Sequence, residues 1–114
     1  MHCGERGYGG GVTPTPYCAD LVRPGFLRVA GEVDELAIER FRADLDRAKA
    51  SGDRAVVDLT AVDFFPSLGV GVLGSLMREM HQADRELTIV AGDGSVAARV
   101  LSVCGISFVA NQPD

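Results

Sequence analysis

The sequence predicts an α/β fold: a mixed, mostly parallel β-sheet of about five strands with helices packed on it, in the order β-β-α-β-α-β-α-β. Short apolar runs typical of strands alternate with longer segments whose apolar residues recur at helical spacing. The later connecting segments are long enough to cross over and keep their strands parallel. At 114 residues, with 46% hydrophobic and 24% charged side chains, the chain has the composition of one globular domain with its own core.

The composition changes near the start of the chain. Residues 1–16 hold five of the fourteen glycines and two Thr-Pro pairs, and they can bury too little apolar surface to offset their ordering entropy. We predict a flexible glycine- and proline-rich tail over 1–16 and one domain over 17–114. A glycine-rich phosphate loop is the alternative for the tail, but no helix follows it to supply oriented N–H groups.

The domain is expected to begin with a β-hairpin and a helix. Two apolar runs, 17–22 and 26–30, are joined by a Pro24-Gly25 turn. Asp34 then occupies the place of an N-cap before a helix over 35–50. The apolar residues of that helix share one face: Ala37, Phe41, Leu45 and Ala48.

The second half alternates strands and helices. The apolar run at 55–59 predicts a strand buried on both faces, and a second helix is expected to open at Pro66 and Ser67. A strand at 87–91, a helix capped by Ser95 and a final strand at 106–109 complete the order. Two apolar stripes are expected on the helices, one of Leu73, Leu76, Met77 and Met80, the other of Val96, Val100, Leu101 and Cys104.

The charges exclude several classes of partner. Eleven Lys and Arg against sixteen Asp and Glu give a net charge of −5, and the longest basic cluster is Arg40 with Arg42. Nucleic acid and anionic membrane are therefore not expected as partners, whereas a protein with a basic or mixed face fits. Because no segment resembles a signal peptide or approaches the roughly 20 apolar residues of a membrane span, we expect a cytoplasmic protein.

Candidate catalytic and metal-binding groups are sparse. The three cysteines, Cys3, Cys18 and Cys104, are widely spaced without a CxxC pair, which argues against a metal site. Neither His2 nor His81 has a nucleophile paired with it. We therefore expect no enzymatic activity and no cofactor.

One glycine motif calls for a choice between two interpretations. Residues 69–74 match GxGxxG, and Asp93 lies 19 residues beyond Gly74, close to where a ribose-binding acid would be. In a dinucleotide fold the first glycine directly follows a strand, whereas Gly69 comes ten positions after Leu59. Small residues on a helix packed tightly against the sheet are the favoured interpretation.

Ser67 also has two interpretations. As an N-cap of the second helix it would contribute on the order of 1 kcal/mol. As a phosphoacceptor it would place about −1.5 to −2 charges on the positive end of the helix dipole. The residues alone favour the cap.

Three patterns follow one another along the chain: a strand pattern ending in Gly-Glu-Val-Asp at 27–34, an apolar strand followed by Phe-Phe-Pro-Ser-Leu-Gly at 55–73, and a helix pattern with Cys-Gly-Ile at 95–106. These stretches resemble the STAS domain, named for sulfate transporters and anti-sigma-factor antagonists, and most resemble the stand-alone bacterial antagonists. Residues 27–34 are similar to the family's strand ending in Gly-Glu-Leu-Asp. Residues 55–73 are similar to its Val-Val-Asp-Leu-Ser and Phe-x-Asp-Ser-Ser-Gly-Leu-Gly-Val-Leu segment, and residues 95–106 to its closing helix and turn. The resemblance implies a module that binds an anti-sigma factor or a related kinase-like regulator and so controls transcription indirectly.

The family's phosphorylation motif, Asp-Ser-Ser-Gly, is altered here to Pro66-Ser67-Leu68-Gly69. The acceptor column is Leu68, and Ser67 matches only the first serine. Either Ser67 has taken over the role or the antagonist works without the switch. Loss is favoured, since Pro66 removes a backbone N–H and a carboxylate near the acceptor.

The resemblance also implies a partner-binding surface around the loop aspartate, Asp34. An exposed Phe65–Leu68 patch would suit protein contact, although at least one of the two phenylalanines is expected in the core. The alternative is a small-ligand or nucleotide-binding STAS module with an anion at the start of the second helix. A homo-oligomer is left open. The predicted partner-binding residues are Asp34, Phe65, Pro66, Ser67, Leu68, Gly69 and Gly71.

Overall fold

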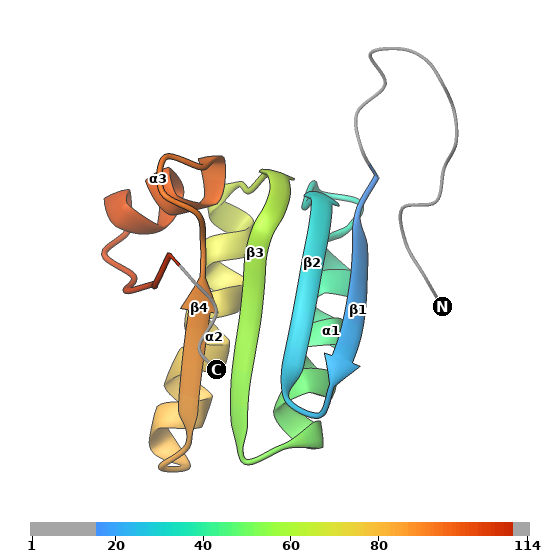
Figure 1. The fold of residues 1–114 in the computed structure, drawn as a ribbon, viewed down its shortest axis with the longest axis vertical. Helices are drawn as coiled ribbons and strands as arrows, with labels where there is room; N and C mark the ends of the chain where they lie inside the picture. Colours follow the sequence, from blue (N-terminus) through green and yellow to red (C-terminus); the bar gives the residue numbers. More distant parts are fainter. Residues whose placement is uncertain (1–15, 111–114) are drawn as a thin grey trace.

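The structure, a computed structural model, describes residues 16–110, and the predicted tail over 1–16 therefore lies almost wholly outside the described residues. Four strands and three helices follow one another in the predicted order (Figure 1). They are β1 (Cys18–Arg23), β2 (Phe26–Glu32), α1 (Ile38–Ser51), β3 (Arg54–Phe64), α2 (Ser67–Gln82), β4 (Glu86–Val90) and α3 (Val96–Val103).

The sheet has the order β1-β2-β3-β4, and the predicted α/β class with a mixed, mostly parallel sheet is confirmed. β1 pairs with β2 antiparallel, whereas β2, β3 and β4 run parallel. The final strand expected at 106–109 is reduced to a single parallel bridge between Val90 and Val109. Two backbone hydrogen bonds of 2.9 Å hold that bridge, one from Val109 to Ile89 and one from Ala91 to Val109.

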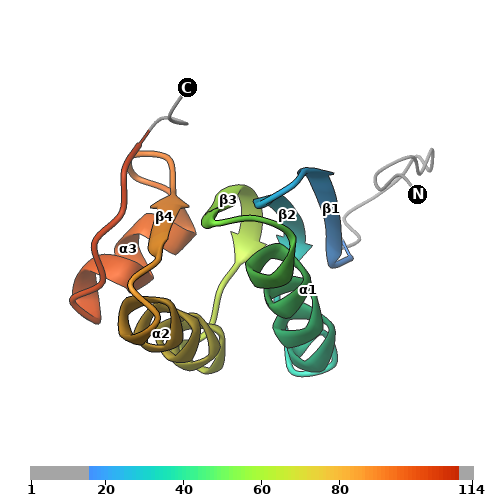
Figure 2. The ribbon, with the colours of Figure 1, turned by 90° about the horizontal axis from the view of Figure 1, so that it is seen from below.

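The helices cover one face of the sheet. α1 and α2 lie side by side beneath it, and α3 lies on the β4 side and packs against β3 and α2 (Figure 2). Within the part of the chain that the structure describes, no helix covers the opposite face. The core fills the space between the layers, and its largest fully buried side chains include Leu27, Val29, Phe41, Leu45, Val57, Leu59, Phe65, Leu73, Met80 and Leu101.

Two of the three predicted helix faces match the core. All four residues expected on the first helix are buried, although Ala37 comes just before α1, and in α2 Leu73, Leu76 and Met80 are buried while Met77 is partly so. The expected face of α3 is wrong for Val96 and Cys104, which are exposed. That helix buries its small residues instead, because Ala97 and Ala98 with Leu101 allow a close approach to the sheet layer.

The turn joining β1 to β2 depends on Gly25. Its φ is +79°, and a Cβ added there would lie 2.4 Å from the carbonyl oxygen of Arg54. The carbonyl of Gly25 in turn accepts a hydrogen bond of 2.7 Å from the amide of Val56. The glycine thus lets the hairpin turn sit directly against the start of β3.

β3 is longer than predicted. It continues from the apolar run to Phe64 because β2 pairs alongside it as far as Glu32 opposite Phe64. The register shifts once between Arg28 and Ala30 and again after Gly31. This extension carries polar residues of β3 to the end of the sheet, where the candidate site lies.

Candidate functional site

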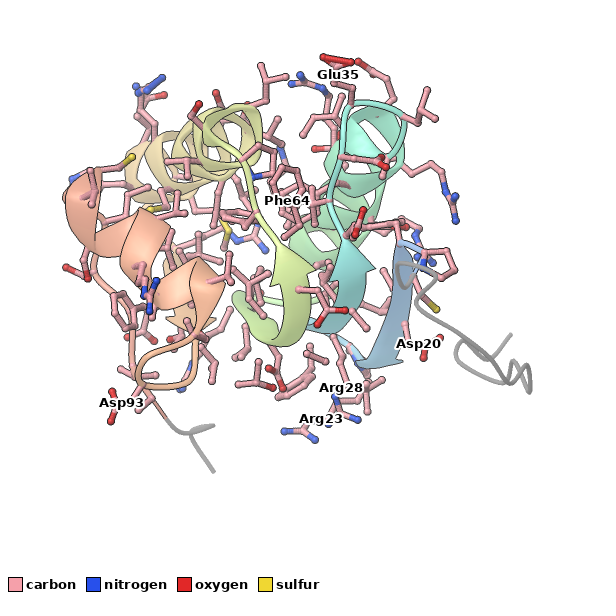
Figure 3. The ribbon with its side chains drawn as sticks, turned by 90° about the horizontal axis from the view of Figure 1, so that it is seen from above. Asp20, Arg23, Arg28, Glu35, Phe64 and Asp93 are labelled. Atoms are coloured by element: carbon pink, nitrogen blue, oxygen red, sulfur yellow. The ribbon has the colours of Figure 1, made fainter. Side chains whose placement is uncertain are left out.

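The segments that follow the three parallel strands meet at one end of the molecule. Because β2, β3 and β4 point the same way, the chain leaves each of them at the same edge before entering α1, α2 or α3 (Figure 1). We call this end the carboxyl-end surface and define it as residues 32–38, 63–68 and 91–96. Figure 3 looks down on it, with Phe64 near the middle and Glu35 and Asp93 at opposite margins.

Asp34 shapes the first of these segments. Its side-chain Oδ1 and its backbone carbonyl each accept a hydrogen bond of 3.0 Å from the amide of Ala37. The predicted role of Asp34 as N-cap of the helix is therefore wrong, because α1 begins later, at Ile38, with Ala37 as its N-cap and no side-chain cap; Asp34 instead closes a turn over 34–37. The bonds hold the half-buried carboxylate in place.

A backbone hydrogen bond joins the first segment to the second. The amide of Val33 donates to the carbonyl of Phe64 at 3.0 Å, directly beyond the paired residues Glu32 and Phe64. The Asp34 loop and the start of α2 are therefore held side by side. The structure brings together these two parts of the predicted partner-binding set.

The two adjacent phenylalanines have different environments. Phe65 is 1% exposed and packs edge-to-face on Phe41, with ring centroids 5.8 Å apart. Gly69 packs beneath it so closely that an added Cβ would lie 2.9 Å from the Phe65 ring. Phe64, in contrast, is 47% exposed. Phe65 therefore belongs to the core, and its predicted place in an exposed patch is wrong. Phe64 is the phenylalanine that is exposed on this surface.

The start of α2 also differs from the prediction. Pro66 occupies the N-cap position with extended backbone, and no side chain caps the helix. Its carbonyl accepts hydrogen bonds from the amides of Gly69 at 2.9 Å and Val70 at 3.3 Å. Ser67 is the first helical residue, exposed, and its expected capping role is wrong because Pro66 precedes it. Ser95, by contrast, caps α3 as predicted, with Oγ 3.1 Å from the amide of Ala98.

Exposed apolar side chains gather at this end. Leu36 is 89% exposed, Leu68 is 57% exposed and Val96 is 41% exposed, in addition to Phe64. These are four of the seven large hydrophobic side chains that are exposed between residues 16 and 110. Leu36, Phe64 and Val96 are not among the residues that the sequence predicts for this surface. The exposure of Leu36 could have been predicted, because Leu36 lies off the apolar face of the predicted first helix.

The same surface is acidic. Its three segments contain no Lys or Arg, and five carboxylates belong to them: Glu32, Asp34, Glu35, Asp63 and Asp93. Because the net charge of the whole chain is −5, the Asp and Glu outside these segments are equal in number to the Lys and Arg. Exposed apolar residues and uncompensated carboxylates thus share one end of the domain.

The GxGxxG motif lies inside α2. β3 ends at Phe64 and α2 begins at Ser67, so Gly69 is the third residue of a helix rather than the first residue after a strand. The dinucleotide geometry is therefore absent over 69–74. The expected tight packing holds for Gly69, but it is wrong for Gly71 and Gly74, where an added Cβ would meet nothing within 4 Å.

Between residues 16 and 110, no three His, Cys, Asp or Glu side chains are arranged so that they could hold a metal ion. None of the helices in that range combines the length and apolar character needed to cross a membrane.

The chain was compared with known families and proteins. The family model of the STAS domain matches residues 18–111. No curated protein matches the chain.

Three solved structures have a similar fold. The anti-sigma factor antagonist SpoIIAA in its unphosphorylated form is 21% identical, with a TM-score of 0.63 over 80% of this chain and 82% of that one. An anti-sigma factor antagonist from Mycobacterium paratuberculosis is 20% identical, with a TM-score of 0.70 over 84% and 86%. The Bacillus cell fate determinant SpoIIAA in the phosphorylated form is 22% identical, with a TM-score of 0.58 over 80% and 85%. The family match over 18–111 and this shared fold show that the chain belongs to the STAS domain family.

Proposed function

We propose that the chain is an anti-sigma-factor antagonist-like interaction module. It binds an anti-sigma factor, or a related serine-kinase-like regulator, in the cytoplasm and thereby controls transcription indirectly. Binding alone is the proposed activity, with no catalytic step and no cofactor. The names of the similar structures support this role.

The observation that carries the proposal is the group of exposed apolar side chains beside Asp34. Leu36 follows β2, whereas Phe64 ends β3 and Leu68 lies in the first turn of α2; the hydrogen bond between Val33 and Phe64 joins these two parts of the chain. Full burial of such a side chain contributes about 1.5–3 kcal/mol, and these three are between 47% and 89% exposed. Covering them would therefore contribute about 4 kcal/mol, a useful share of the free energy of a stable protein complex.

The proposed module works without the phosphoswitch of its family. Leu68, at the acceptor column, has no hydroxyl group and presents an apolar side chain to solvent. Ser67 is exposed, but Pro66 stands where the family has an aspartate. Binding is then constitutive, and its level depends on the amounts of the two proteins.

A nucleotide-binding or small-ligand STAS module is the alternative. The start of α2 is a helix N-terminus of the kind that suits an anion, but the amides of Gly69 and Val70 already donate to the carbonyl of Pro66. In addition, five carboxylates and no Lys or Arg belong to the surrounding surface. These charges oppose an anionic ligand and favour a protein.

The test measures binding to the purified anti-sigma factors and serine-kinase regulators encoded in the genome of the source organism. Leu68→Asp should weaken binding at least tenfold, because it places a sixth carboxylate where an apolar contact is expected. Val22→Asp is the matched control, since Val22 is 46% exposed on β1, near the opposite end of the sheet. Equal binding by the Leu68→Asp variant and the wild type would refute the proposed surface.

A second measurement tests the absence of the switch. The chain is incubated with a regulator that binds it and with ATP, and its mass is then determined. No added phosphate is expected. A single phosphate that Ser67→Ala abolishes, together with loss of binding, would show that Ser67 has taken over the role.

A further inference from the structure

We propose that the carboxyl-end surface recognises a protein face that is apolar at its centre and rich in Lys and Arg at its rim. This inference names the chemistry of the partner and rests on the proposed function only for the site. It also includes residues 91–96, from the segment between β4 and α3 to the first residue of α3, which were not among the partner-binding residues predicted from the sequence.

The first argument is the separation of charge within the domain. The three segments that form the surface carry five carboxylates without a Lys or Arg, and all other charges of the chain balance. The nearest basic residues along the chain are Arg28, Arg40 and Arg99. Arg28 lies 3.7 Å from Asp58, and the guanidinium of Arg40 lies over the ring of Tyr17, 5.1 Å from its centroid. These two arginines are thus engaged with other groups.

The second argument is the arrangement of the two kinds of side chain. Phe64 lies near the middle of the surface, whereas Glu35 and Asp93 lie at opposite margins (Figure 3). Glu32 is paired with Phe64 across β2 and β3, so one carboxylate also adjoins the central aromatic residue. An apolar centre with a charged rim is the anatomy of protein interfaces, in which the centre supplies affinity and the rim supplies steering and selectivity.

The charges also disfavour three other occupants. A second copy docking by the same surface would bring five carboxylates against five, so a symmetric dimer through this end is disfavoured. A free nucleotide or an anionic lipid surface carries the same sign of charge and is repelled. A basic protein face remains the occupant with complementary charge.

Charge complementarity should speed the association of the chain with a basic partner. Charge complementarity raises association rates about 10- to 1,000-fold at low ionic strength. The Debye length falls from about 10 Å at 0.1 M salt to about 3 Å at 1 M, which screens exposed rim charges. We expect association to slow at least tenfold across that range of salt, with a much smaller change in the dissociation rate.

The experiment uses three synthetic helical peptides of roughly five turns as probes. One has a leucine stripe flanked by Lys and Arg, the second has the same stripe flanked by Glu, and the third keeps the basic flanks but has Ser in place of Leu. Each is titrated into the isotope-labelled full chain, and amide chemical shifts are followed by NMR. The basic leucine peptide should shift the amides of Leu36, Phe64, Leu68 and Val96, and the other two should bind at least tenfold more weakly.

Two charge reversals sharpen the test. Glu35→Lys should weaken the basic leucine peptide about threefold, as expected for one rim charge. Asp53→Lys changes the net charge equally but lies between α1 and β3, at the opposite end of the sheet, and should leave the affinity unchanged. An acidic peptide that binds as well as the basic one would overturn the inference, as would shifts centred on Asp53 and Glu86.

The outcomes separate this inference from the proposed function. If the basic peptide binds at the carboxyl end but no anti-sigma regulator does, the inference stands and the proposed function fails. If a regulator binds with an association rate that salt does not change, the function stands and the inference fails.

Discussion

The two adjacent phenylalanines give the sharpest prediction, since Phe65 is buried in the core and Phe64 is exposed on the proposed binding surface. Phe65→Ala removes a side chain that is 1% exposed and packed on Phe41 at 5.8 Å. A buried Phe→Ala change costs about 3–5 kcal/mol of unfolding free energy. Phe64 is 47% exposed, so Phe64→Ala should cost about 1 kcal/mol or less.

Urea denaturation followed by circular dichroism measures both values, with the slope of each transition checked for two-state behaviour. Because Phe65→Ala can leave the chain largely unfolded, Phe65→Leu serves as the second variant, with an expected loss of about 1–1.5 kcal/mol. Phe65→Leu should bind the regulator like the wild type, whereas Phe64→Ala should bind it more weakly. Equal destabilisation by Phe64→Ala and Phe65→Ala, or normal binding by Phe64→Ala, would refute the reasoning.

Three further predictions concern the fold. Gly25→Ala should lower the free energy of unfolding by at least about 2 kcal/mol, because φ is +79° and the new Cβ would lie 2.4 Å from the carbonyl oxygen of Arg54; thermal denaturation that shows no change would contradict this packing. Asp84→Gly should stabilise the chain by about 0.5–1 kcal/mol, because Asp84 has φ of +62° just after α2; a lower melting temperature would contradict that geometry. Burial, together with a 2.6 Å hydrogen bond to Asp44, raises the pKa of Tyr17 above its usual value of 10.0. The associated stability is present below pH 10.0 and lost above it, so the wild type should lose up to about 1.4 kcal/mol per pH unit more than Tyr17→Phe there; parallel losses in alkaline urea titrations would refute this.

The order of strands and helices could be predicted because local patterns and tertiary packing agree. The Pro24-Gly25 turn, the apolar face of α1 and the Ser95 cap all depend on neighbours within a few residues. Such features are visible in a sequence, since the residues that determine them lie next to one another. The α/β class follows from them directly.

The length of β3 could not be predicted in the same way. Its last residues include Thr60 and Asp63, which do not continue the apolar run. They adopt strand geometry because β2 pairs alongside them, with two shifts of register that no local pattern indicates. The final strand expected at 106–109 differs in the opposite direction. Its residues are mostly apolar, yet the segment makes only one bridge, between Val109 and Val90.

The candidate site was predicted at the level of loops and not of individual side chains. The Asp34 loop and the start of α2 were placed together, and the structure joins them through Val33 and Phe64. Which phenylalanine faces solvent depends on the turn between β3 and α2 and on the contact between Phe65 and Gly69. The negative charge of this surface could not be predicted from local patterns. Its carboxylates come from three segments that are far apart in the sequence and meet only in the folded domain.

The most direct test of the account maps the surface that the regulator covers. Amide hydrogen exchange of the full chain is compared with and without a bound anti-sigma regulator, and NMR cross-saturation then identifies the contacting side chains. The account predicts protection and saturation at Leu36, Phe64 and Leu68, with none on the helix-free face of the sheet. A footprint on that face, or along the exposed side of α1, would contradict the proposed binding surface.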